Sequence, residues 1–245
     1  MSIEKLIEKS FNDLIKAITT DGTSSQLIFP CYRDGNERRS EQELRQIFLR
    51  NVEEDKTYFY SIETPTKYGY RFKDSKNLEV DKNHKKGEHQ AARFDISLYN
   101  KDYKDNDKAS NHIEFKYGNP DQKNAICKDF LKLISEVDLT KEKKNFFVHY
   151  LCVKTEKGWE SRTFPSLFSK YLDSVADIIK SDLINEEDLS KVTVYLLCIF
   201  EEPEAESEPK IASAYHFSLA DLKNYKVRTK YSDLTDKSWL NEELI

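Results

Sequence analysis

The sequence of this 245-residue chain predicts an α/β fold, and three observations support this prediction. Segments 92–99 and 111–117 alternate apolar and polar residues, as half-buried strands do. Segments 40–51 and 121–137 carry apolar residues at helical spacing, and segment 145–153 is a continuous apolar run typical of a buried strand. Helices and strands therefore follow one another along the chain. Since 38% of the residues are hydrophobic and 12% aromatic, the chain can bury a sizeable core.

Two helices are predicted in the N-terminal part of the chain. Apolar residues recur at helical spacing from Ile3 to Ile18, so the first helix is expected to be amphipathic. Ser40 and Glu43 form an S-x-x-E capping box, which places the start of the second helix near residue 40.

Strands are predicted to follow these helices. Aromatic and β-branched residues are frequent in 57–65 and 67–72, which predicts two strands around a Pro-containing turn. The highly charged segment 73–90 is predicted to be a mobile loop. In the two alternating strands that come next, the expected apolar faces are Phe94, Ile96 and Leu98 in one and Ile113, Phe115 and Tyr117 in the other. The opposite faces carry Arg93, Asp95 and Ser97, and His112, Glu114 and Lys116.

The remainder of the chain is more acidic than the part before it. We expect a helix near 165–180, an apolar strand at 192–200 and a strand-like segment at 210–219. Residues 151–245 contain 12 basic and 18 acidic residues, a net charge of -6, whereas residues 1–150 contain 27 and 26, a net charge of +1. The acidic C-terminal part is a candidate surface for a homodimer or a protein partner.

Several classes of protein are excluded by the sequence patterns. No window approaches the roughly 18 apolar residues of a membrane-spanning helix, and the start lacks a signal-peptide core, so we expect a cytoplasmic protein without membrane contact. The four cysteines stand far apart with no C-x-x-C spacing, which excludes a structural zinc site or disulfide framework. Neither a P-loop nor a G-x-G-x-x-G motif is present.

Three charged residues form the strongest candidate site. Glu114 and Lys116 are two residues apart in a predicted strand, so their side chains must leave the same face. If the strand that carries Asp95 pairs with this one, Asp95 and Glu114 can share a divalent cation, Mg²⁺ or Mn²⁺. A lysine beside such a cation can position or activate a water and offset charge in the transition state. The chemistry implied is metal-dependent hydrolysis of phosphodiester bonds.

The run RFDISLY, the 18 residues between Asp95 and Glu114, and the following IEFK resemble the core signature of the PD-(D/E)xK nuclease superfamily. The resemblance implies a restriction-endonuclease-like αβββαβ core with a mixed central sheet, and a Mg²⁺-dependent endonuclease that acts on DNA in bacterial defence or repair. It also implies a helical glutamate that supports the metal, for which Glu41 is the best match and Glu43 the competitor. Phe94 stands where the signature has proline.

The resemblance covers about half of the chain. We expect an N-terminal helix and connection at 1–36, the nuclease-like core at 37–155 and an α/β extension at 156–245 packed on that core. The [DE]-x-K pattern occurs eight times, but only at Glu114 does it lie in an alternating strand that follows a strand with a lone acidic residue. The alternative is a solvated sheet face on which Asp95, Glu114 and Lys116 form ordinary cross-strand ion pairs.

Basic residues near this site are candidates for contact with nucleic acid. Lys123, Lys128 and Lys132 lie on the predicted helix after IEFK, which flanks the active site in the family, and would contact phosphates if they share a face. The alternative is a solvated helix face. Arg93 is expected to share a face with Asp95, where it can hold a phosphate or form a salt bridge to a neighbouring acid.

Two other functions remain open at this point. The same fold can act as a non-catalytic module that binds nucleic acid or protein through the acidic site. A third hypothesis is a non-catalytic regulator whose charged loops mediate protein contacts. The intact Asp95, Glu114 and Lys116 triplet favours the enzyme.

Overall fold

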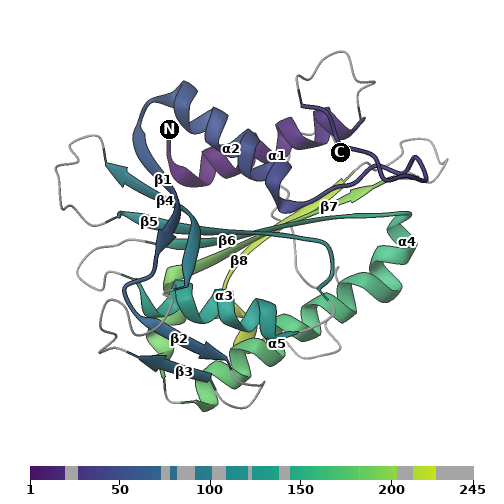
Figure 1. Ribbon diagram of the computed structural model, residues 1–245. Coiled ribbons are helices and arrows are strands. Elements are labelled where there is room, and N and C mark those ends of the chain that lie inside the picture. Colours follow the sequence, from purple (N-terminus) through teal and green to yellow (C-terminus); the bar gives the residue numbers. More distant parts are fainter. Residues whose placement is uncertain are drawn as a thin grey trace.

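The computed structural model describes residues 1–19, 27–72, 78–81, 92–100, 109–120, 123–137, 144–181, 183–202 and 212–224. These residues form a mixed α/β fold in which one large sheet lies between two layers of helices (Figure 1). The α/β class predicted from the sequence is therefore confirmed. None of the helices in this part of the chain combines the length and the apolar character needed to cross a membrane.

The central sheet has six strands in the order β1-β4-β5-β6-β7-β8. β5, β6 and β7 run parallel to one another, and the remaining neighbours are antiparallel, so the sheet is mixed as expected. The strands are β1 (Tyr58–Pro65), β4 (Arg93–Asn100), β5 (Asn111–Tyr117), β6 (Asn145–Val153), β7 (Val192–Phe200) and β8 (Ala212–Ser218). The C-terminal strands β7 and β8 thus continue the same sheet.

Two helices, α1 (Ile3–Thr19) and α2 (Glu41–Asp55), cover one face of this sheet (Figure 1). The capping box predicted for α2 is present, because the Ser40 side chain caps the first turn and the Glu43 carboxylate accepts from the Ser40 amide at 2.7 Å. The apolar stripes of both helices pack on Ile96, Leu98, Ile113 and Phe115 of the sheet. This cluster is one of two cores.

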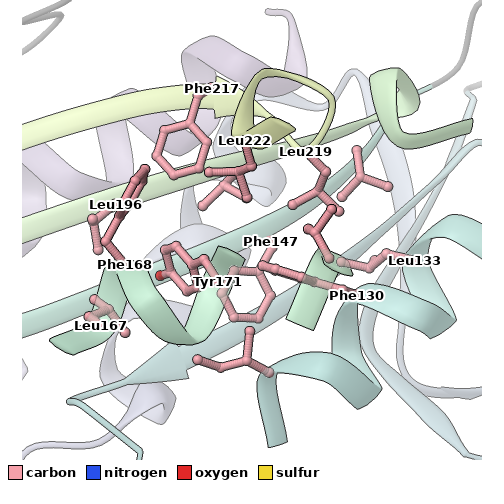
Figure 2. Packing of buried hydrophobic residues seen from close by; sticks show 14 of the residues in the cluster. Phe130, Leu133, Phe147, Leu167, Phe168, Tyr171, Leu196, Phe217, Leu219 and Leu222 are labelled. Carbon is pink, nitrogen blue, oxygen red and sulfur yellow. The ribbon is translucent and has the colours of Figure 1, made fainter. Parts of the chain in front are cut away.

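The second core lies on the opposite face, beneath α3 (Lys123–Ser135) and α5 (Phe164–Lys180). A short helix α4 (Glu156–Gly158) and a π-helical turn (Trp159–Thr163) lead from β6 into α5. Figure 2 shows the aromatic centre of this core, where Phe130 of α3 meets Phe147 of β6 edge-on at a ring separation of 4.9 Å. Short 3-10 helices at Glu186–Lys191 and Asp221–Asn224 complete the fold.

The chain between β1 and β4 contains a small hairpin of β2 (Gly69–Phe72) and β3 (Leu78–Asp81). The sequence predicted β2 but assigned 73–90 to a loop; this is wrong for Leu78–Asp81, because these residues pair with β2. The rest of that segment lies outside the described residues. Glu136 anchors the start of the hairpin, since its carboxylate accepts from the amides of Lys67 and Tyr68 at 2.8 Å each and from the Tyr70 hydroxyl at 3.2 Å.

One predicted strand face differs in the structure. Ile96 and Leu98 pack toward α1 and α2 as expected, but Phe94 lies in the opposite core. There it stacks on His112 at a ring separation of 4.0 Å. β4 stays paired with β1 as far as Arg93, but its pairing with β5 ends at Ile96, and Phe94 lies just beyond this point.

Candidate active site

The candidate site lies where β4 and β5 stop pairing. Only three residue pairs join the two strands, from Leu98 opposite Asn111 to Ile96 opposite Ile113, although both strands continue beyond this point. Asp95 is the next residue of β4, and its Oδ2 accepts a hydrogen bond from the Phe115 amide at 2.7 Å. A side-chain carboxylate thus takes the place of a backbone acceptor, and the two strands stay joined through Asp95.

Glu114 and Lys116 leave the same face of β5, as the strand alternation predicts, and this face is covered by α3. Glu114 Oε1 lies 2.5 Å from Lys132 Nζ, and Lys116 Nζ lies 2.9 Å from Asp129 Oδ2. Glu114 is 4% exposed. The face is therefore no solvated surface with cross-strand pairs; its ion pairs are buried between a strand and a helix.

Lys132 is at the centre of this arrangement. Its ammonium contacts Glu114 Oε1 at 2.5 Å, the Arg93 carbonyl oxygen at 2.9 Å and Asp129 Oδ1 at 3.2 Å. The side chain is 5% exposed and its ammonium lies 5.6 Å from the centre of the Phe94 ring. One cation therefore joins β4, β5 and α3.

The electrostatics of the site couple its charged groups. Burial raises the pKa of Asp95, and the charge of Asp129 raises it further. Burial raises the pKa of Glu114 well above its usual value, with Asp129 and Asp95 acting in the same direction. Burial acts to lower the pKa of Lys116, but the charges of Asp129 and Glu114 outweigh it, and the pKa is raised. The carboxylates repel one another, and cations in the cluster are stabilised.

Helix α2 brings further charges to the same place. Glu41 is its first residue, and its charge is among the causes that raise the pKa of Lys116. Glu43 is buried, with its carboxylate engaged by the Ser40 amide and hydroxyl, so of the two candidates it is the one held in the helix cap. Arg45 Nη1 lies 3.7 Å from Asp95 Oδ1 and 3.2 Å from Glu63 Oε1.

The residues proposed as DNA contacts lie in different environments. Lys132 does not lie on a solvated face of α3, and this corrects the prediction that it contacts phosphate at the surface. The sequence pattern did not show that Glu114 of β5 and Asp129 of α3 would each place a carboxylate beside it. Lys128 lies half-buried on the same helix, and Lys123 is the first residue of α3, with its side chain outside the described part. Arg93 is 63% exposed, and its Nη1 lies 4.0 Å from Glu63 Oε2.

A buried histidine lies beside the site on β6. His149 is opposite Lys116 in the parallel pairing of β5 and β6. Its Nδ1 lies 2.5 Å from the Tyr171 hydroxyl, and its Nε2 lies 2.5 Å from the Gly118 carbonyl oxygen. Burial lowers the pKa of His149 to about 3. The imidazole is thus neutral, and its hydrogen bond with Tyr171 joins β6 to α5.

Sequence reasoning missed Arg45, Asp129 and the buried role of Lys132. Asp129 is three residues before Lys132 and is buried among the apolar residues of α3. A pair of opposite charges at this spacing inside an apolar helix face was the available signal, because it requires partners on the facing element. No comparable local signal marks Arg45.

The donors fit a divalent metal ion in their chemistry. Asp95, Glu114 and Asp129 supply carboxylate oxygens, which Mg²⁺ and Mn²⁺ prefer, and the mutual repulsion of these carboxylates would be relieved by a cation. As arranged, no group of three or more His, Cys, Asp or Glu side chains in the described ranges is positioned to hold a metal ion. Comparison of the chain with protein-family models, curated proteins and solved structures finds no match.

Proposed function

We propose that this chain is a metal-dependent nuclease of the PD-(D/E)xK type that hydrolyses phosphodiester bonds in DNA. The observation that carries the proposal is the convergence of Asp95, Glu114 and Lys116 at the point where β4 and β5 separate. The order of α2, three antiparallel strands, α3 and a parallel β6 supports it, since it is the order that the resemblance implied.

The proposed metal site consists of Asp95 and Glu114, with Glu41 as support from the start of α2. When bound, a divalent cation would polarise the phosphate and lower the pKa of an attacking water. Asp95 is held in place by the Phe115 amide, which leaves Oδ1 directed toward Arg45 at 3.7 Å. Glu114 is held through Oε1 by Lys132.

The remaining charged residues have roles in binding substrate. The Lys116 ammonium, fixed by Asp129 at 2.9 Å, would position the scissile phosphate and offset its developing charge. Lys123 and Lys128 on α3, and the exposed Arg93, would contact flanking phosphates. We extend the proposal to a cytoplasmic role in bacterial defence or repair, for which the resemblance to the superfamily is the sole support.

The second candidate function is a non-catalytic binding module on the same fold. One observation favours it: Lys132 and Asp129 already neutralise Glu114 and Lys116, so the cluster is paired within the fold. The acidic segment proposed as a surface for a homodimer or protein partner includes residues 203–211, which lie outside the described residues.

The test is cleavage of supercoiled plasmid and of a labelled single strand in Mg²⁺, Mn²⁺ or EDTA. We expect metal-dependent cutting that falls by about 100-fold or more in Asp95→Asn and in Lys116→Ala. Glu54→Gln is the matched control, because Glu54 is an exposed carboxylate of α2 whose partners among the described residues are Lys9 of α1 and Arg50 of α2. It should cut as the wild type does.

The opposite result favours the binding module. A wild-type protein that unfolds cooperatively, cuts neither substrate and shows no Mn²⁺ binding by calorimetry would overturn the nuclease proposal. Cutting that persists in EDTA, or in both site variants, would place the activity elsewhere.

A further inference from the structure

The surroundings of the Lys132 ammonium are those of a bound cation. Each of its three contacts is an oxygen, and each comes from a different element: the Arg93 carbonyl of β4, Glu114 of β5 and Asp129 of α3. An ammonium has three donors, so these contacts can use all of them. The side chain is almost fully buried, which leaves little room for water to replace any of these oxygens.

Charge explains why the cluster needs this cation. Glu114 and Asp129 are both buried, and Asp95 adds a third carboxylate close enough to influence them. A buried carboxylate without a partner is strongly destabilising. Without Lys132, Glu114 would lose its only ion pair among the described residues.

A divalent cation at the proposed metal site would share Glu114 with Lys132. A Mg²⁺ or Mn²⁺ ion bound to Glu114 Oε1 at about 2.1 Å would lie within about 4.6 Å of Lys132 Nζ, since that nitrogen is 2.5 Å from the same oxygen. Two cations at this distance inside the fold repel each other strongly. The metal therefore binds only if Lys132 moves away, or it binds with lower affinity while Lys132 stays nearby.

We propose that Lys132 is the resident cation of the carboxylate cluster formed by Asp95, Glu114 and Asp129, and that it competes with a divalent metal ion for this cluster. The inference rests on the proposed function for the identity of the metal site. It assigns Lys132 to the control of metal affinity and not to phosphate contact. The fold is stable without metal because Lys132 supplies the positive charge.

The test compares Lys132→Met with wild type, using Mn²⁺ alone as the probe and no DNA. Methionine keeps much of the length of the side chain and removes its charge. In EDTA, the melting temperature of Lys132→Met should be lower than that of wild type, and Mn²⁺ should restore much of the difference. Calorimetry should show Mn²⁺ binding at least about tenfold tighter in the variant.

Lys180→Met is the control, since Lys180 is the exposed last residue of α5, a helix that carries no member of the carboxylate cluster. It should bind Mn²⁺ as wild type does. The inference is overturned if Lys132→Met binds Mn²⁺ no more tightly than wild type, or if Mn²⁺ leaves its lower melting temperature unchanged.

A second variant covers failure to fold. Lys132→Gln keeps an amide donor for the Arg93 carbonyl but removes the charge, so it should change in the same direction by a smaller amount. If either variant folds only when Mn²⁺ is present, the inference is supported. If both remain unfolded with and without Mn²⁺, the cluster does not accept a metal in place of the lysine, and the inference is overturned.

These outcomes can be separated from those for the nuclease. If Lys132→Met binds Mn²⁺ more tightly while the wild type cuts neither DNA substrate, the resident cation is supported and the nuclease function fails. If the wild type cuts DNA and Lys132→Met gains no affinity for Mn²⁺, the nuclease function stands and the resident cation fails.

Discussion

The buried His149 makes a measurable contribution to stability that depends on pH. The Gly118 carbonyl can only accept a hydrogen bond, so Nε2 carries the proton, and Nδ1 accepts from the Tyr171 hydroxyl. Burial is the main cause that lowers the pKa of His149 to about 3, and the nearby charges of Lys116 and Lys170 act in the same direction. The folded protein therefore holds a neutral imidazole until strongly acidic pH.

The sign and size of the effect follow from the two states. In the unfolded chain the pKa of a histidine is about 6.5, so between pH 6.5 and 3 the unfolded state binds a proton that the folded state does not. The stabilisation is fully present above this window and is lost as the pH falls through it. At pH 5 the loss amounts to about 2 kcal/mol, and each further pH unit adds about 1.4 kcal/mol.

The assay is urea unfolding of wild type and His149→Gln at pH 7.5 and pH 5. The variant should be less stable than wild type at pH 7.5, because it loses the hydrogen bonds of the imidazole, and this deficit should shrink by about 2 kcal/mol at pH 5. Other titrating groups, such as the buried Asp95 and Glu114, are common to both proteins and largely cancel in the difference.

Tyr171→Phe is the control, since it removes one of the two hydrogen bonds but leaves the histidine in place. Its stability deficit should be nearly equal at the two pH values. A deficit of His149→Gln that does not change with pH would show that the folded imidazole takes up its proton as readily as the unfolded one, and would refute the reasoning.

Two further predictions concern Glu136, which directly follows α3, and the glutamates in the first turn of α2. Glu136→Ala should lower the free energy of unfolding in urea by about 2–3 kcal/mol, because it leaves two backbone amides without their acceptor; Tyr70→Phe, which removes one hydroxyl donor only, should cost about 1 kcal/mol. An equal cost for both would argue against the anchoring role of the carboxylate. Glu43→Ala should lower the free energy of unfolding by about 1 kcal/mol, because it removes the capping box. Glu41→Ala should leave thermal stability near that of wild type but weaken Mg²⁺-dependent cleavage. The reverse pattern would exchange the roles of the two glutamates.

Local patterns in the sequence were sufficient for most elements of this fold. The alternation in 111–117 predicted β5 and put Glu114 and Lys116 on one face, and the capping box located the start of α2. These features depend on residues two to four positions apart, whose relative directions are fixed by the geometry of a strand or a helix. Apart from β3, the order of helices and strands from residue 40 to 153 could be read in the same way.

The tertiary structure decided how the site is assembled. The separation of β4 from β5, and with it the turn of Phe94 into the opposite core, depends on where strand pairing ends. The pairing of Lys132 with Glu114, 18 residues away, depends on α3 crossing over β5.

Sequence spacing alone treated the lysines of α3 as equivalent, either all contacts to phosphate or all solvated charges. Their different environments arise because burial and opposite charge come from the elements that face the helix, and these contacts are made only when the layers pack together.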